Sequence, residues 1–254
     1  LGVPTRGVDA LERWSESFFY LFMAIPSQDV RERLDAALMD FRAFLREVIR
    51  DRRAHPANDL ISDLLAARRA GGLTEEQLVD NCMLLFADGV ENVDRAIGNA
   101  IYALLTHPDQ LQLLRRRPEL APSAVEECLR FESPGQYIGR IAREEVEFSG
   151  VRIPEGSMVL LVIGSANRDP EVFDRPDAFD ISRARNPHLA FGRGRHSCVG
   201  GPLVALEMRA ALEVLIARTS ELRLATNEVR FVPRPGHRWI EQVPVRWKAS
   251  GGAG

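Results

Sequence analysis

A run of residues at helical spacing, about 74–106, constrains the fold of this chain most. Its middle reads N-C-M-L-L-F-A-D-G-V-E-N-V, which is apolar on most sides of a helix, so we expect the helix to run through a core. Thr74 and Gln77 give it a capping-box-like start, and His107-Pro108 ends it. Other elements must therefore pack around this helix.

The remaining pattern divides the chain into a helical first half and a part with short strands. Apolar spacing predicts a helix over 28–54, and shorter helices follow at about 109–117 and 122–132. After Tyr137 come strand-like pieces at 137–143, 145–148, 151–153 and 157–163. A late helix over 200–217 should be largely buried, and its apolar stripe comprises Leu203, Leu206, Ala210, Val214 and Ala217.

These patterns predict a mainly α fold with a small β region, formed as a single domain over 1–254. Residues 1–134 are expected to be mostly helical, including the long core helix. Residues 135–189 would form the β region and an irregular meander, 190–217 a cysteine loop with its following helix, and 218–247 the C-terminal strands.

Composition excludes several classes of partner. The formal net charge of −3 gives no electrostatic reason to bind nucleic acid or an anionic membrane. The sequence has no uninterrupted apolar run of the roughly 18 residues needed to span a bilayer, and nothing in it suggests secretion. Three scattered cysteines are too few for a disulfide framework, so we expect a cytoplasmic protein.

The stretch F-G-R-G-R-H-S-C-V-G at 191–200 surrounds one cysteine, Cys198, with three glycines. Glycines allow positive φ and close approach of the backbone to a bulky ligand. The start of the following helix offers free N–H groups and the positive end of a dipole, both of which stabilise a thiolate. A buried structural cysteine is the plain alternative, and a zinc site lacks a second ligand pair. The number of matching residues favours a thiolate ligand.

This stretch resembles the haem-binding signature of the cytochrome P-450 family, F-G-x-G-x-H-x-C-x-G, at every fixed position. The resemblance implies a cytochrome P-450 fold and a haem b whose iron is bound by the thiolate of Cys198. It also implies a propionate contact from His196, packing of Phe191 near the proximal face of the ring, and close backbone approach at Gly192 and Gly200.

Two further motifs fit the same family. Glu127 and Arg130 form an E-x-x-R, which in isolation is usually a solvated pair but in this family is a buried structural pair. The family completes that network with a basic residue where this chain has Ala178, and Arg175 or Arg183 are the candidates to replace it. Arg140 falls where the family places an arginine on a haem propionate, and a fork-shaped cation suits that role.

The core helix departs from the family pattern. Asp88, Gly89, Glu91 and Asn92 interrupt its apolar sequence, and each buried unpaired polar group would cost roughly 1–3 kcal/mol. They either line a wet crevice or, by resemblance, lie at the oxygen-binding face, where Gly89 makes room and an acid–alcohol pair delivers protons. Glu91 matches the acid, but Asn92 replaces the alcohol and cannot relay a proton as a hydroxyl does.

The resemblance also implies partners. Substrate contacts are expected from Phe86, Ala87, Val90, Gln136, Tyr137, Ile138, Trp239 and Ile240. A basic face formed by Arg183, Arg185, Arg193 and Arg195 would steer an acidic ferredoxin-type electron donor.

The sequence leaves three functional hypotheses. The first is a bacterial haem-thiolate monooxygenase that oxidises a small organic substrate with O₂, with secondary metabolism as its setting. The second is a cytochrome P-450-like auxiliary protein without oxygen chemistry, and the third a haem enzyme of atypical, non-hydroxylating chemistry. L-G-V-P at 1–4 resembles an internal segment of the family. We therefore expect the N-terminal part of the fold to be absent from this chain, as in a fragment, a short relative or one of two complementary chains.

Overall fold

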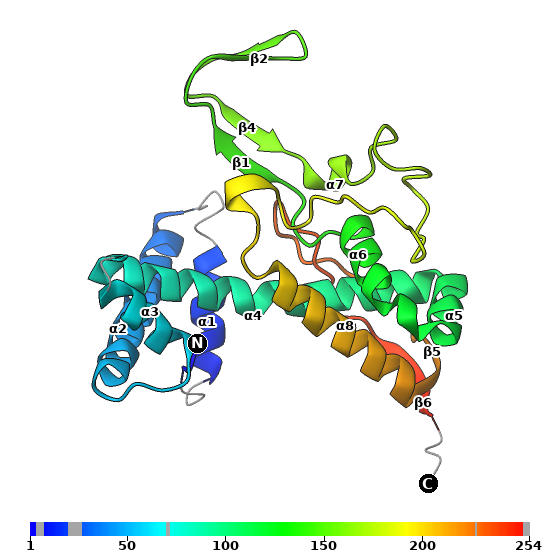
Figure 1. The fold of residues 1–254 in the computed structure, drawn as a ribbon, viewed down its shortest axis with the longest axis horizontal. Coiled ribbons are helices and arrows are strands. Elements are labelled where there is room, and N and C mark those ends of the chain that lie inside the picture. Colours follow the sequence, from blue (N-terminus) through cyan, green and yellow to red (C-terminus); the bar gives the residue numbers. More distant parts are fainter. Residues whose placement is uncertain (4–7, 20–26, 70–71, 227, 251–254) are drawn as a thin grey trace. The chain divides into compact units, whose positions relative to one another are not determined.

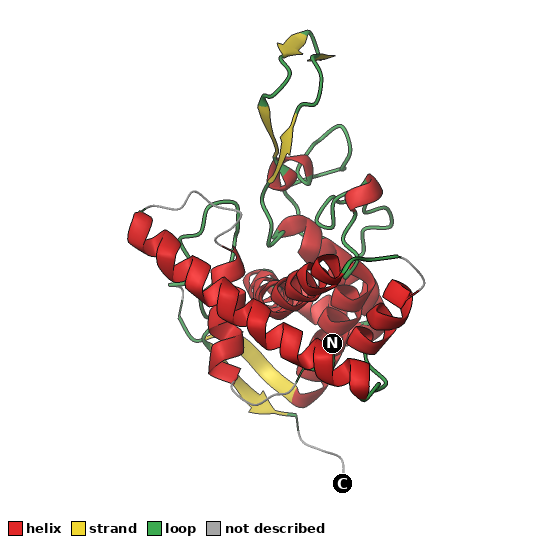
Figure 2. Ribbon diagram, turned by 90° about the vertical axis from the view of Figure 1, so that its left-hand side faces the viewer, coloured by secondary structure: helices red, strands yellow, loops and turns green. Residues whose placement is uncertain are grey.

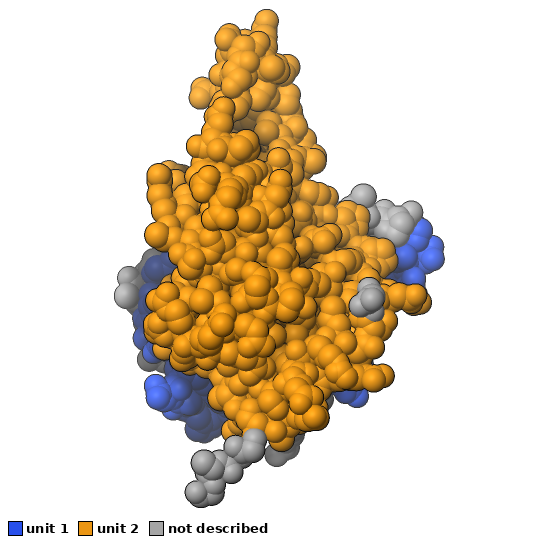
Figure 3. All heavy atoms as spheres, turned by 90° about the vertical axis from the view of Figure 1, so that its right-hand side faces the viewer, with its two compact units in different colours: residues 1–92 blue, residues 93–254 orange. Residues whose placement is uncertain are grey.

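A computed structural model of the chain describes residues 1–3, 8–19, 27–69, 72–226 and 228–250. The fold divides into two compact units, Leu1–Asn92 (unit 1) and Val93–Gly254 (unit 2), coloured separately in Figure 3. Each unit is described by itself. The arrangement of 1–254 as a single domain stays a prediction.

Unit 1 consists of helices. They are α1 (Val8–Phe19), α2 (Gln28–Ala54), α3 (Leu60–Arg69) and the part of α4 (Glu75–Thr106) up to Asn92. The predicted helix 28–54 is confirmed with the same bounds, and Phe41, Leu45 and Ile49 from its apolar stripe are buried. They form a core with residues of α4 such as Leu78 and Cys82.

The predicted start of the long helix is also confirmed. Thr74 Oγ1 accepts a hydrogen bond from Gln77 N at 3.1 Å, and Gln77 Oε1 accepts one from Thr74 N at 2.9 Å. This reciprocal pair is a capping box, which satisfies two N–H groups that a helix start leaves without partners. The expected burial of the middle of this helix is confirmed only in part: Cys82, Met83 and Ala87 are buried in the core of unit 1. Leu84 and Val90 are each 41% exposed.

Unit 2 holds a second core. The helices α5 (Pro108–Arg116), α6 (Ala121–Phe131) and α8 (Gly201–Arg218) join the remainder of α4 around buried residues such as Leu104, Leu114, Leu129 and Leu212. The short 3₁₀ helix η2 (Pro118–Leu120) precedes α6. In this unit α6 packs against α8.

The predicted buried stripe of α8 is wrong. Leu203, Leu206 and Val214 are exposed, whereas Met208 and Leu212 on another face are buried. The physical reason is that α8 has apolar residues on nearly all sides, so its sequence does not mark one face as the inner one. Packing against α6 determines which face of α8 is buried.

Three two-stranded antiparallel sheets form the β region (Figures 1 and 2). They pair β1 (Ile138–Ile141) with β4 (Met158–Leu161), β2 (Val146–Phe148) with β3 (Val151–Ile153), and β5 (Thr219–Leu224) with β6 (Val245–Ala249). The first four strands lie within the predicted pieces, whereas the short α7 (Ile163–Ala166) was missed. Among the described helices, none is long and apolar enough to cross a membrane.

Candidate functional site

The loop that carries Cys198 is a series of tight turns before α8. Gly192 N donates to Leu189 O at 2.8 Å, Ser197 N donates to Gly194 O at 3.0 Å, and Cys198 N donates to Phe191 O at 2.8 Å. A single 3₁₀ turn, η3 (Gly194–His196), lies between them. Gly192 and Gly194 have φ values of +66° and +84°, a region that other L-residues enter only with strain. The glycines of the motif therefore make this turn sequence possible.

Cys198 is the one exposed cysteine, since Cys82 and Cys128 are both buried. The alternative of a buried structural cysteine is therefore wrong for Cys198. The next residue, Val199, is 83% exposed, although an apolar side chain gains from burial. An exposed thiol beside an exposed valine leaves an open apolar surface around the sulfur.

The start of α8 offers donors to that surface. Within the described part of the chain, the N–H groups of Val199 and Gly200 have no acceptor. Both follow the sulfur-bearing residue directly and stand at the positive end of the helix dipole. A Cβ on Gly200 would lie 3.8 Å from Cys198 Sγ, and a Cβ on Gly201 would lie 3.4 Å from the Phe191 ring. Gly201, which the sequence analysis did not single out, thus lets Phe191 lie against the start of α8.

Strand β1 lies beside this loop (Figure 1). A Cβ on Gly192 would lie 3.9 Å from Ile138 Cδ1, so the loop and the strand are in contact. Arg140 on the same strand is exposed and donates only to Gly139 O, at 2.8 Å. The His196 side chain is also exposed and has no hydrogen bond to any described residue. Both side chains therefore have N–H donors that can bind an external carboxylate.

Behind the loop, Glu127 and Arg130 form a fully buried ion pair. Arg130 Nε lies 2.7 Å from Glu127 Oε2, and both side chains are 0% exposed. Arg130 also donates to Glu127 Oε1 and to the carbonyls of Asn167, Pro176 and Ala178, at 2.7–2.9 Å. All five N–H groups of the guanidinium are satisfied, which is the condition for burying such a pair without a large penalty.

Arg183 takes the place that Ala178 leaves open in the network. Its Nε lies 3.2 Å from Glu127 Oε2, while the other candidate, Arg175, pairs with Asp180. Asn186, which the sequence analysis missed, donates to the same Oε2 at 3.1 Å. Arg183 is only 9% exposed, so it is not part of a basic face. Its inclusion in that face is corrected, and Arg185, Arg193 and Arg195 are exposed.

The predicted substrate-contact residues of unit 2 lie on two segments that are paired. Gln136 N donates to Gly236 O at 2.8 Å, Arg238 N donates to Pro134 O at 2.8 Å, and Gly135 bridges His237. Tyr137 is 39% exposed, whereas Trp239 and Ile240 are buried. A direct substrate contact from the last two residues stays a prediction.

The predicted oxygen-side residues lie on one turn of α4 in unit 1. Asp88, Gly89 and Val90 are exposed, and a Cβ on Gly89 would meet nothing within 4 Å. The Asn92 amide donates to Asp88 O at 3.4 Å. Asp88 keeps exposed surface, but the surrounding protein limits the hydration of its carboxyl and raises its pKa. The side chain of Glu91 lies outside the described residues.

Two other predicted contacts belong to the core of unit 1. Ala87 is buried, and Phe86 packs edge-on against Phe41 with ring centroids 5.3 Å apart. Val90 on the same helix is 41% exposed. Of these three, Val90 has the side chain most available to a ligand.

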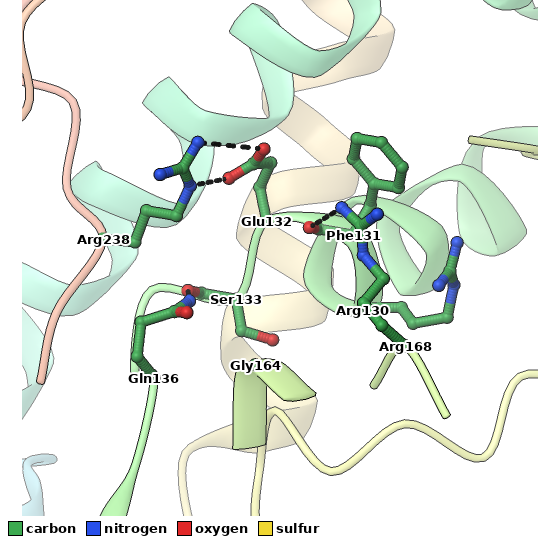
Figure 4. A pocket seen from close by; sticks show the side chains of 8 residues that line it. All are labelled: Arg130, Phe131, Glu132, Ser133, Gln136, Gly164, Arg168 and Arg238. Atoms are coloured by element: carbon green, nitrogen blue, oxygen red, sulfur yellow. Dashed lines mark hydrogen bonds and ion pairs between the residues drawn. The ribbon is translucent and has the colours of Figure 1, made fainter. Parts of the chain in front are cut away.

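A pocket of about 230 Å³ lies at the end of α6 (Figure 4). Glu132 and Arg238 form an ion pair at one side, and Arg168 lies at the other. Every guanidinium group here has an anionic or carbonyl partner: Arg168 binds Asp177 and Phe131 O, and Arg130 belongs to the buried network. Each guanidinium group that lines the pocket is therefore already engaged within the protein.

Comparisons with known proteins agree with this arrangement. The family model "Cytochrome P450" matches residues 9–116 and 112–220. The biotin biosynthesis cytochrome P450 of Bacillus subtilis (strain 168) is 40% identical over 248 residues, which is 98% of this chain and 63% of that protein. The crystal structure of P450BioI in complex with a hexadec-9Z-enoic acid-ligated acyl carrier protein has a TM-score of 0.93 at 40% identity. That match covers 98% of this chain and 64% of the P450BioI chain.

The name of a third similar protein states the bond that it forms. The structure of the cytochrome P450 enzyme CxnD, for C–S bond formation in chuangxinmycin biosynthesis, has a TM-score of 0.86 at 37% identity, covering 96% of this chain and 60% of that one. The fold and the exposed cysteine loop define a haem-thiolate protein. The chain belongs to the cytochrome P450 family, and it spans slightly under two thirds of the length of these relatives.

The cofactor of this family is haem b, bound through a cysteine thiolate. The residues of this chain fit it. Cys198 presents an exposed thiol beside apolar Val199, and the next two residues have N–H groups without acceptors among the described residues. The exposed side chains of Arg140 and His196 have N–H donors to spare. A flat apolar ring with an iron and two carboxylates matches that set of groups.

Proposed function

We propose that the chain is the haem-binding part of a monooxygenase that oxidises an organic substrate with O₂ and electrons from a redox partner. The observation that carries the proposal is the exposed thiol of Cys198, on a glycine-rich loop at the start of α8. Membership of the cytochrome P450 family supports it. A structural cysteine would have no need of this exposure or of adjoining free N–H groups.

Each predicted residue has a role in this proposal. Cys198 binds the iron, and the N–H groups of Val199 and Gly200 moderate the charge of its sulfur. Arg140 and His196 hold the propionates, while Phe191, Gly192 and Gly200 shape the proximal side. Bound haem supplies the oxygen chemistry.

The remaining roles concern protons and substrate. On α4, Gly89 leaves room for oxygen, and Glu91 and Asn92 organise water and protons. Val90, Tyr137 and Ile138 are the substrate contacts that exposure supports best.

The substrate we propose is a mainly apolar acyl-type molecule of bacterial secondary metabolism. The names of the similar proteins support this class, since one belongs to biotin biosynthesis and one was crystallised with a fatty acyl group on a carrier protein. The exposed surface of Val90 and Tyr137, two of the proposed substrate contacts, suits an apolar chain better than a charged substrate.

The test is oxygen transfer with a probe of that class. Haem-loaded protein would be incubated with hexadec-9Z-enoic acid, a ferredoxin, its reductase, NADPH and isotopically labelled O₂, and products analysed by mass spectrometry. We expect one labelled oxygen atom per oxidised product, and none with Cys198→Ala. Release of all consumed O₂ as peroxide by the haem-loaded protein would contradict monooxygenase function.

The electron donor we propose is an acidic ferredoxin that docks on Arg185, Arg193 and Arg195. These three arginines are exposed, and the last two belong to the cysteine loop itself: Arg193 precedes η3 and Arg195 lies within it. The double variant Arg193→Glu with Arg195→Glu should slow reduction of the haem severalfold at low salt, with a smaller effect at high salt. Arg152→Glu, on β3, is the control, and an equal effect of both changes would exclude a local docking site.

Asn92 favours a second candidate, a haem enzyme of non-hydroxylating chemistry. Its amide is engaged with Asp88 O, and an amide does not relay protons as an alcohol does. The similarity to CxnD, a cytochrome P450 for C–S bond formation, supports this candidate too. Asn92→Thr distinguishes the two: a fall in the share of O₂ released as peroxide supports a proton-delivery role, and an unchanged share supports the second candidate.

A further inference from the structure

Asn99 is the one asparagine of α4 that is fully buried. It is 0% exposed, although asparagine is a poor helix former and its amide is costly to bury without partners. Both N–H groups of its amide are used: Nδ2 donates to Glu132 O at 3.1 Å and to Arg238 O at 2.7 Å. Its Oδ1 accepts from Ile240 N at 3.3 Å. The position is thus an internal hydrogen-bonding node.

The node joins two segments that are far apart in the sequence. One segment, 132–138, connects α6 with β1 and carries Gln136, Tyr137 and Ile138. The other, 236–240, carries Trp239 and Ile240 near the C-terminus. Both segments were predicted to contact substrate, yet neither is part of a helix that could hold its backbone in place.

Contacts between the two segments continue outward from the node. Glu132 and Arg238 form an ion pair at its edge, visible in Figure 4 beside Gln136. Gln136 N donates to Gly236 O at 2.8 Å. A Cβ on Gly236 would lie 2.9 Å from Tyr137 Cζ, so the tyrosine ring rests directly on that glycine. Arg95, one turn before Asn99, donates to Ile240 O at 3.5 Å.

We propose that Asn99 is a positioning residue for substrate recognition, which fixes segments 132–138 and 236–240 against each other through three hydrogen bonds. Being buried, Asn99 contacts no substrate itself, and it acts through Tyr137, Ile138 and their neighbours. The inference rests on the proposed function, because it names what shapes the substrate side of the same site. It predicts that substrate recognition depends on a residue inside the core.

The test compares two iron ligands of different size on haem-loaded protein. Imidazole needs only the iron, whereas clotrimazole is bulky enough to contact the surrounding segments. Asn99→Leu keeps the branched shape of the side chain but removes all three hydrogen bonds, which leaves two carbonyls and one N–H without partners. We expect clotrimazole to bind about tenfold more weakly, and imidazole to bind as in the wild type. Asn81→Leu is the matched control, because Asn81 lies on the same helix and its amide donates only to Gln77 O.

Three outcomes decide whether Asn99 positions the two segments for substrate recognition. A selective loss of clotrimazole affinity supports the proposal, whereas unchanged affinity, or an equal loss for both ligands, overturns it. Where Asn99→Leu fails to fold, Asn99→Asp replaces it, since it keeps the size of the side chain and an acceptor for Ile240 N but removes both donors to the carbonyls of Glu132 and Arg238. A wild-type protein without a thiolate-type carbon monoxide spectrum would refute the proposed function instead, so the two failures are distinguishable.

Discussion

Replacing Arg183 with alanine tests whether this residue has taken over the third position of the buried network. The change removes a guanidinium that is 9% exposed and lies 3.2 Å from a carboxylate with no exposure at all. Its other bonds go to the carbonyls of Asp174, Arg175 and Ala178; the first two residues lie at the surface, where water replaces a lost donor. The charge-assisted bond to Glu127 therefore sets the cost, at about 2 kcal/mol.

Urea unfolding followed by tryptophan fluorescence measures that cost. With a slope of about 2–3 kcal/mol per molar urea for a chain of this size, the midpoint of Arg183→Ala should fall by roughly 0.7–1 M. Arg185→Ala removes an exposed arginine two residues away and should leave the midpoint unchanged. Adding Ala178→Arg to Arg183→Ala should restore at least half of the loss. Equal urea midpoints for Arg183→Ala and Arg185→Ala would refute the claim that Arg183 fills the third position of the buried network.

Further predictions concern the loop, the thiols and the oxygen-side turn. Gly192→Ala places a Cβ at φ +66°, which costs about 1–2 kcal/mol, so the variant should lose haem faster during dilution; an unchanged rate would contradict the role of the turn. In haem-free protein Cys198 should react rapidly with an aromatic disulfide reagent. Cys82 and Cys128 should react only on unfolding, because both are buried and burial raises the pKa of Cys82 to about 11; fast reaction of all three would refute this. The raised pKa of Asp88 means that the folded state favours the protonated carboxyl. Its contribution to the free energy of unfolding is therefore present below the usual pKa of 3.8 and is lost as the pH rises above it. Asp88→Asn should therefore unfold at higher urea than the wild type at pH 7 and equally at pH 3, and the same difference at both pH values would exclude burial as the cause.

Local sequence signals predicted part of this structure well. The helix over 28–54 and the capping box of Thr74 and Gln77 follow from interactions within a few residues, so the sequence alone specified them. The cysteine loop was recognisable for the same reason, since its turns need glycines at fixed offsets.

Features that depend on distant parts of the chain were not predictable. The buried face of α8 was assigned wrongly, because a helix with apolar residues all round gives no directional signal. The places of Arg183 and Asn186 around Glu127 depend on how the 174–186 stretch folds back on α6. The node at Asn99 joins backbone groups from two segments more than a hundred residues apart, and a single asparagine in a helix does not reveal such partners.

The central claim is that Cys198 binds haem iron as a thiolate. The most direct measurement is the absorption spectrum of the haem-reconstituted chain, reduced under carbon monoxide, with Cys198→Ala and the neighbouring exposed Ser197→Ala in parallel. A thiolate-type shift of the Soret band in the wild type and in Ser197→Ala, lost in Cys198→Ala, is the predicted result. The same spectrum from all three proteins, or no haem retained by the wild type, would contradict it.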